Sequence, residues 1–238
     1  MTTTTAAQAD GLTPAQASRL HARARRRFLS FYPGGFADPD YVALERRNKA
    51  RAHQKWREEL SRERMRALLR AGEFVLVADT ALRIEGAAKL LFSFEKMALR
   101  DATRQRAGAR IFATGLAQLL YDNAPAPARF AAWIEAVRRL PQIQSRVLTW
   151  PVLTVFPFLA DPTRHLYVKP TVTMTAAARW GFPFRYSSAP QYATYRSALD
   201  FAARIAEDLN AARFPGGRGR DLIDRQSFIW VAGSSEYD

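Results

Sequence analysis

Apolar residues recur at helical spacing from the first structured part of the chain. One side of a helix over residues 14–33 carries the apolar positions Ala17, Leu20, Ala24, Phe28 and Phe31. Spacings of three and four residues are typical of an amphipathic helix that faces a core. Thr13 is suited to cap this helix, with Pro14 at its first position. The pattern therefore predicts a helix that begins at Pro14.

A second helix is predicted over residues 39–61. Asp38 can cap it, and Pro39 suits its first turn. The apolar side of this helix consists of Tyr41, Leu44, Trp56 and Leu60. A different side carries cations four residues apart, which indicates an outer face exposed to solvent.

The helical pattern continues to residue 141. The further helices expected are 61–73, 74–87, 94–105, 108–122 and 128–141. Gly72 and Gly86 are expected to end helices, and Ser93 is expected to cap one. Residues 74–78, FVLVA, have strand propensity, but their apolar positions keep the 3.6-residue period, which favours a helix.

Prolines interrupt the chain more often after Pro141. Residues 149–160 are predicted to form a buried helix or a strand, and residues 165–169, HLYVK, one short strand. Helices are predicted over 171–181 and 191–213. The fold class predicted is mainly α, with at most one or two short strands in the C-terminal half. The expected organisation is a disordered tail (1–13), a helical region with basic faces (14–144) and a Pro-rich helical region (145–238) packed with it as one unit.

Charge narrows the possible partners. The chain has 36 Lys and Arg against 22 Asp and Glu, a formal net charge of +14, which attracts polyanions such as nucleic acid. An Arg-rich genome would produce the same excess without any such partner. The residues expected to contact DNA phosphates are Arg19, Arg23, Arg26, Arg47, Arg51, Lys55, Arg164, Arg218 and Arg220. The alternative partner for this surface is an acidic protein, for instance in a bacterial defence or repair system.

Other features exclude several classes of function. The sequence has no cysteine, which removes disulfides and cysteine-ligated zinc and fits a reducing compartment. It has no signal-peptide pattern and no apolar run long enough to span a membrane, so the cytoplasm is expected. Its three histidines lie on separate segments, so we predict neither a metal site nor a cofactor.

The C-terminal part carries a longer arrangement of motifs. An apolar run is followed by ADPTRHLYVKPTV (160–172), by tyrosines that lead into a long helix, and by DLIDRQSFIWV (221–231). In order and spacing, residues 145–232 resemble the helix-hairpin-helix DNA glycosylase superfamily. The Gly-x-Gly turn that gives this superfamily its name is absent. The resemblance implies an all-helical scaffold that faces DNA.

Three residues in these motifs are candidates for catalysis. Lys169 could hold a phosphate or form a Schiff base, or it could be a turn residue before a helix. Asp221 and Asp224 lie three residues apart and could hold a divalent cation or orient a water molecule. Equally, Asp221 could cap a helix while Asp224 pairs with a semi-buried arginine. The functions that remain are a DNA-binding protein, a DNA-processing enzyme of the glycosylase or nuclease type that uses these residues, and an interaction module.

Overall fold

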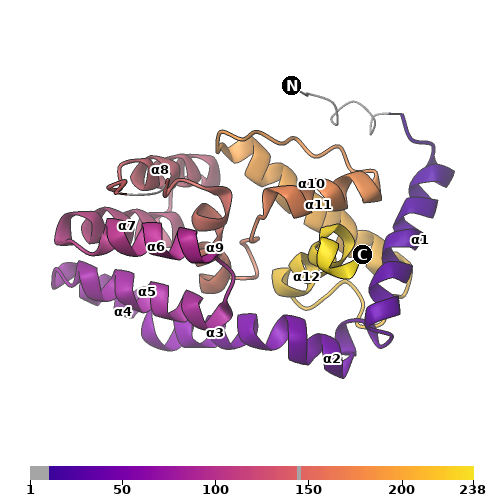
Figure 1. Ribbon diagram of the computed structural model, residues 1–238, viewed down its shortest axis with the longest axis horizontal. Coiled ribbons are helices and arrows are strands. Elements are labelled where there is room, and N and C mark those ends of the chain that lie inside the picture. Colours follow the sequence, from indigo (N-terminus) through magenta and orange to yellow (C-terminus); the bar gives the residue numbers. More distant parts are fainter. Residues whose placement is uncertain (1–10, 144–145) are drawn as a thin grey trace. The chain divides into compact units, whose positions relative to one another are not determined.

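Helices make up nearly all of the regular structure (Figure 1). The computed structural model describes residues 11–143 and 146–238, and no strand occurs within these ranges. This confirms the mainly α fold. The helices are α1 (Pro14–Phe31), η1 (Gly35–Ala37), α2 (Pro39–Tyr41), η2 (Val42–Arg46), α3 (Arg47–Glu59), α4 (Arg62–Arg70), α5 (Phe74–Ala88), α6 (Ser93–Thr103), α7 (Arg106–Tyr121), α8 (Ala126–Arg138), α9 (Trp150–Ala160), α10 (Pro170–Trp180), α11 (Tyr192–Ala211), α12 (Leu222–Gly233) and η3 (Ser235–Tyr237).

The chain forms two compact units. Unit 1 comprises residues up to Arg47 together with Val168–Ala189 and Ala193–Asp238, and unit 2 comprises Asn48–Tyr167 with Pro190–Tyr192. The predicted regions 14–144 and 145–238 divide the chain at a different place, and their packing as one unit stays a prediction. Ser145, the expected boundary, and residues 1–10 of the expected tail lie outside the described residues.

The core of unit 1 is an aromatic cluster around Phe28 of α1. The ring of Phe28 lies 5.3 Å from the ring of Phe36 and 5.4 Å from that of Phe228 on α12. Helices α10 and α12 approach closely at Gly233, where a Cβ atom would lie 2.1 Å from the backbone oxygen of Val172. The absence of a side chain at this position therefore allows the two helices to pack together.

The predicted helix over residues 39–61 is present, but its hydrogen bonding changes along its length. Residues Val42–Arg46 form a π-helical turn between α2 and α3. Such a turn inserts an extra residue into the helical repeat and rotates the side chains that follow relative to those before it. Leu44 is 70% exposed. The expectation that Leu44 belongs to the apolar side was therefore wrong, whereas Tyr41, Trp56 and Leu60 are buried.

Helices α4 to α8 of unit 2 lie beside one another with their axes roughly aligned (Figure 1). Helix α9 is almost entirely buried, in agreement with the buried-helix alternative for residues 149–160. Pro157 lies inside α9 and has no N–H for the carbonyl of Leu153, four residues earlier. The indole Nε1 of Trp133 donates to that carbonyl at 2.9 Å. A side chain of α8 thus supplies the hydrogen bond that the proline removes.

Most predicted helix ends are confirmed, and three local expectations were wrong. Thr13 and Asp38 accept backbone N–H groups as caps. Gly86 lies inside α5, which ends with Lys89 in the left-handed conformation. Ser93 is the first residue of α6, one position after its cap. Residues 165–169 have no regular secondary structure, so the short strand expected there is absent.

Candidate nucleic-acid interface

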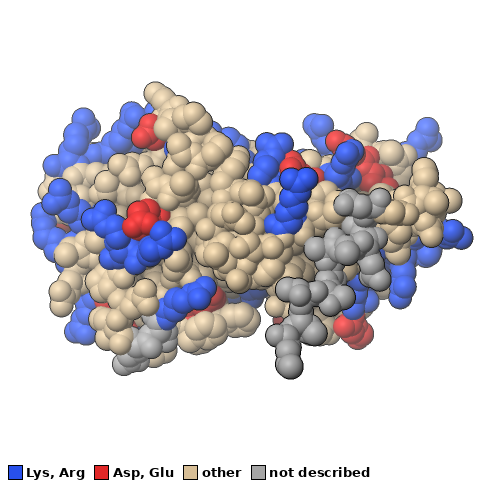
Figure 2. All heavy atoms as spheres, turned by 90° about the horizontal axis from the view of Figure 1, so that it is seen from above, with Lys and Arg blue, Asp and Glu red and all other residues tan. Residues whose placement is uncertain are grey.

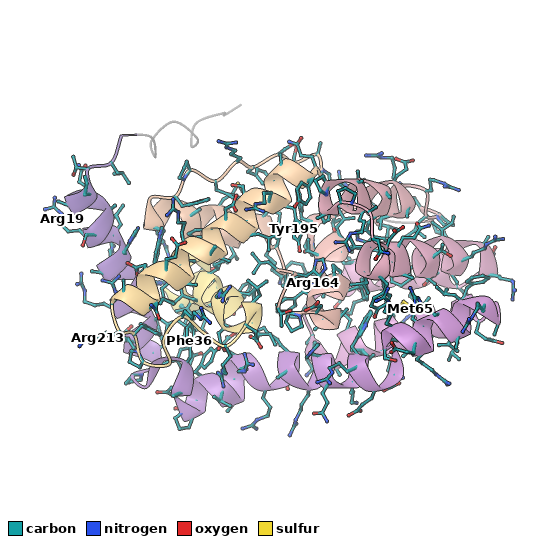
Figure 3. The ribbon with its side chains drawn as sticks, turned by 180° about the vertical axis from the view of Figure 1, so that it is seen from behind. Arg19, Phe36, Met65, Arg164, Tyr195 and Arg213 are labelled. Atoms are coloured by element: carbon teal, nitrogen blue, oxygen red, sulfur yellow. The ribbon has the colours of Figure 1, made fainter. Side chains whose placement is uncertain are left out.

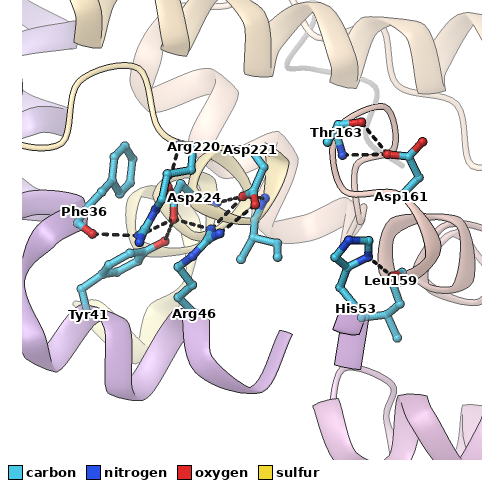
Figure 4. Close-up of polar contacts among 11 residues, drawn as sticks. Phe36, Tyr41, Arg46, His53, Leu159, Asp161, Thr163, Arg220, Asp221 and Asp224 are labelled. Carbon is cyan, nitrogen blue, oxygen red and sulfur yellow. Dashed lines mark hydrogen bonds and ion pairs between the residues drawn. The ribbon is translucent and has the colours of Figure 1, made fainter. Parts of the chain in front are cut away.

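Asp224 is the centre of a buried ion-pair network in unit 1 (Figure 4). Its side chain is 0% exposed and lies between two arginines. Nη1 of Arg46 donates to Oδ1 at 2.8 Å, and Nε of Arg220 donates to Oδ2 at 2.9 Å. The hydroxyl of Tyr41 donates to Oδ1 at 2.6 Å. This environment matches the interpretation of Asp224 as the partner of a semi-buried arginine.

Electrostatics in this network favour the ionised form of Asp224. Burial by itself would raise the pKa of the Asp224 carboxyl, but hydrogen bonds from Arg220 and Tyr41 and the charge of Arg46 lower it below its usual value. Burial and the Asp224 carboxylate raise the pKa of Tyr41, so its phenol keeps its proton. The Asp224 carboxylate is therefore paired, and it stays charged at every pH above its lowered pKa.

Asp221 caps α12 and joins the same network. Its Oδ1 accepts the backbone N–H of Ile223 at 3.0 Å, and both carboxylate oxygens accept from Arg46 at 2.8 Å. The interpretation of Asp221 as a helix cap is confirmed. Capping and pairing account for both carboxylates without a substrate, and a catalytic role for them stays a prediction.

Lys169 immediately precedes α10 in unit 1. Its Nζ lies 5.0 Å from the centre of the Trp230 ring, within the range of a cation–π contact. This position agrees with the interpretation of Lys169 as a turn residue before a helix. The structure joins Asp221 to Asp224 through Arg46, and it places the Lys169 Nζ over the ring of Trp230.

The arginines of α1 fall into two groups. Arg25 pairs with Asp208, and Nε of Arg27 donates to the backbone oxygen of Val231 at 2.9 Å. These two arginines therefore hold α1 against the rest of unit 1. The predicted stripe of Arg19, Arg23 and Arg26 is exposed, and Arg19 projects from α1 (Figure 3). Within the described ranges, none of these three forms an ion pair.

An open groove of about 380 Å³ lies beside α1 in unit 1. Its cationic residues are Arg25, Arg26 and Arg213, and its apolar residues include Leu29 and Phe214. Arg213 adopts φ +50°, a conformation that usually favours glycine. Its N–H donates to Asn210, and that of Phe214 donates to Leu209, so Arg213 ends α11. Arg213 was not among the residues predicted from the sequence. The signal that could have found it is that no glycine directly follows the end of α11, so another residue must adopt the left-handed conformation there.

Helix α3 carries the second predicted row of cations. Arg47, the last residue of unit 1, and Arg51 and Lys55 of unit 2 are all exposed on this one helix. None of the three forms an ion pair with another described residue. Steps of four residues on one helix correspond to a rise of about 6 Å each. The expectation that these cations are exposed on one helix is confirmed.

A further cationic pair, missed in the sequence, lies at the start of α7. The guanidinium groups of Arg106 and Arg110 lie 5.5 and 5.7 Å from the centre of the Phe74 ring. Both arginines are exposed, and the described parts of the chain offer them no acidic partner. Arg106 and Arg110 are four residues apart, like the cations of α3 that were predicted to share an exposed helix face. The same inference applied to residues 106–110 would have found them.

The remaining predicted residues differ in availability. Arg218 is exposed in the loop before α12, with no acidic partner in the ranges that the structure describes. Arg220 is engaged by Asp224 and by the backbone oxygen of Phe36, at 2.9 Å. Arg164 pairs with Asp161, which also accepts from Thr163 (Figure 4). A phosphate would have to compete with those partners at Arg164 and Arg220.

No group of three or more metal-binding side chains occurs among residues 11–143 and 146–238, and none of the helices there is long and apolar enough to cross a membrane. Comparisons with protein-family models, with curated proteins and with solved structures find no significant match to this chain.

Proposed function

We propose that this protein binds nucleic acid, and duplex DNA in particular, through exposed arginines and lysines that contact phosphates. The observation that carries the proposal is the row of cations on α3, which are exposed and form no ion pair among the described residues. A cation that is held in no ion pair exchanges water and counterions for a phosphate without first breaking one.

The surface charge supports the same proposal. Lys and Arg outnumber Asp and Glu by 36 to 22, and Figure 2 shows basic side chains spread over the face that it draws, with fewer acidic ones among them. Contacts of this kind position a protein on the phosphate backbone and carry no base information. We therefore propose binding that is independent of sequence, in the cytoplasm, with no cofactor.

Neutralising the α3 cations should weaken DNA binding and leave the fold stable. For the triple variant Arg47→Gln, Arg51→Gln, Lys55→Gln we expect lower affinity for a mixed-sequence duplex at low salt. The slope of log K against log salt should become shallower by about 0.9 for each phosphate that the variant no longer binds. Fluorescence anisotropy over a salt series measures both quantities, and thermal unfolding checks the fold.

A second triple variant is the matched control. Arg138, Arg196 and Arg204 are exposed arginines that already pair with Glu135, Asp200 and Glu207. Replacing these three with glutamine removes the same net charge, but we expect a smaller loss of affinity. Equal losses in both variants would assign the binding to net charge alone. Absence of duplex binding at low salt, together with binding to an acidic protein, would replace the proposal with the interaction module.

A further inference from the structure

A groove of about 360 Å³ runs between α5 and α6 in unit 2. Its volume lies within the range of small-molecule sites. The residues that line it are Asp79, Leu82, Arg83, Glu85, Gly86, Lys96 and Arg100. None of them belongs to the cation rows on α1 and α3 that carry the proposed function.

The unusual residue in this groove is Glu85, whose side chain is 0% exposed. Its Oε1 accepts the backbone N–H groups of Leu90 at 3.0 Å and Leu91 at 2.7 Å, and so holds the loop between α5 and α6. Its Oε2 is buried and accepts no hydrogen bond from the described residues. Buried acceptors in native proteins nearly always have a donor, so Oε2 points to a missing one.

Lys96 does not fill this role. Its Nζ lies 3.9 Å from Oε2, which is beyond hydrogen-bond distance. Burial raises the pKa of the Glu85 carboxyl, while the backbone N–H of Leu91 and the charge of Lys96 oppose that rise. The Lys96 side chain is 28% exposed and flexible by nature, so it can shift toward the mouth of the groove.

The rim of the groove carries three cations and the exposed carboxylate of Asp79. Lys96 and Arg100 lie one turn apart on α6, and Arg83 lines the opposite side from α5. Arg83 is bound to Glu59, and Lys96 lies 3.9 Å from Oε2 of Glu85 as its ion-pair partner, so Arg100 is the rim cation that forms no ion pair with a described residue. A suitable ligand therefore combines a hydrogen-bond donor for Glu85 with an anionic group for α6.

One wall of the groove is open at Gly86, which is exposed. Gly86 presents no side chain, and a Cβ atom added to it would meet no atom within 4 Å. Leu82, four residues earlier on α5, provides an apolar surface next to this gap. A flat group can therefore lie along α5 between the buried carboxylate and the cations.

We propose that the α5–α6 groove binds one nucleotide whose base carries an exocyclic amino group. The amino group donates to Glu85 Oε2, the ring lies along Leu82 and Gly86, and the phosphate pairs with Lys96 and Arg100. Glutamate is an acceptor for the amino group of cytosine, and unpaired bases are commonly read in this way. The nucleotide is either free or part of a single strand of bound nucleic acid. In the second case the inference rests on the proposed function.

Calorimetric titration of the full chain with CMP and with UMP tests this inference. These ligands differ at position 4 of the base, an amino donor in CMP and a carbonyl acceptor in UMP, and at N3, an acceptor in CMP and an N–H donor in UMP. We expect CMP to bind about tenfold more tightly or better. Glu85→Gln keeps the shape and the acceptor for the loop but places an NH2 donor at Oε2, so the preference should reverse.

Two further variants separate the groove from the rest of the surface. Gly86→Leu places an apolar side chain in this open space, where its Cβ atom would meet no atom within 4 Å, and should abolish binding of both nucleotides while thermal stability is kept. Arg139→Gln removes an exposed charge outside the groove and should change neither affinity. Equal affinities for CMP and UMP, or nucleotide binding that survives Gly86→Leu, would overturn the inference.

The remaining measurements distinguish this inference from the proposed function and identify the source of the nucleotide. Duplex binding that depends on the α3 cations, together with no binding of CMP, refutes the nucleotide site and leaves the proposed function standing. Displacement of CMP by a twelve-residue deoxycytidine strand, but not by a thymidine strand, supports a single-stranded ligand. Displacement by neither strand supports a free nucleotide in the same site.

Discussion

Replacing Asp224 with alanine should lower the free energy of unfolding by about 3–5 kcal/mol, the range for breaking a buried ion pair. The variant would leave Arg46, whose side chain is 14% exposed, with Asp221 as its remaining carboxylate. It would also remove the acceptor of the buried Tyr41 hydroxyl. Urea denaturation followed by circular dichroism measures this loss.

Asp200 provides the comparison for this experiment. It pairs with Arg196 four residues earlier on α11, and its side chain is 45% exposed. Asp200→Ala should cost less than about 1 kcal/mol, since exposed pairs contribute little. If the two substitutions destabilise the protein equally, the network around Asp224 does not hold unit 1 together in the way that its geometry implies.

Acidification should destabilise unit 2 through His165. Burial, together with the charges of Arg164 and Arg129, lowers the pKa of His165 to about 4, against the opposing effect of Asp161. An unfolded chain takes up this proton near pH 6.5, so the folded state binds fewer protons between these values. The stability contributed by neutral His165 is therefore complete above pH 6.5 and is lost as the pH falls to about 4, to a total of about 3 kcal/mol.

Two measurements check the role of His165. In an NMR titration, the imidazole protons of His165 should stay unchanged until the pH approaches 4. In denaturation experiments between pH 7 and 4, a His165→Leu variant should lose stability less steeply than the native chain. A midpoint near 6.5 for His165 would show that the imidazole is hydrated and that another group causes any acid sensitivity.

The parts of the fold that could be predicted depend on neighbours in sequence. Thr13 and Asp38 cap helices because their side chains reach N–H groups two or three residues away. Leu44 could not be placed in this way, because the π-helical turn around it changes the helical repeat. Gly86 was taken for a helix end, yet α5 continues past it to Ala88 and ends at Lys89, which adopts the left-handed conformation without being glycine.

The same division applies to the candidate site. Periodicity was enough to expect exposed cations on α1 and α3, because the positions opposite an apolar stripe face solvent. It could not show that Arg25 pairs with Asp208 while its neighbour Arg26 remains exposed, since that pairing joins residues far apart in the chain. Glu85 gave no signal at all, because its orphaned oxygen exists only in the folded groove.

The hydrogen bond between Trp133 of α8 and the Leu153 carbonyl of α9 affects the order in which Trp133 and Pro157 can be substituted during evolution. A carbonyl oxygen has two lone pairs, so replacing Pro157 first would give Leu153 an intrahelical donor while it still accepts from the Trp133 indole. Replacing Trp133 first would leave the same buried carbonyl without either donor. Exchange at these two positions is therefore tolerated more readily when the proline changes before the tryptophan, although each residue alone looks like an ordinary member of the core.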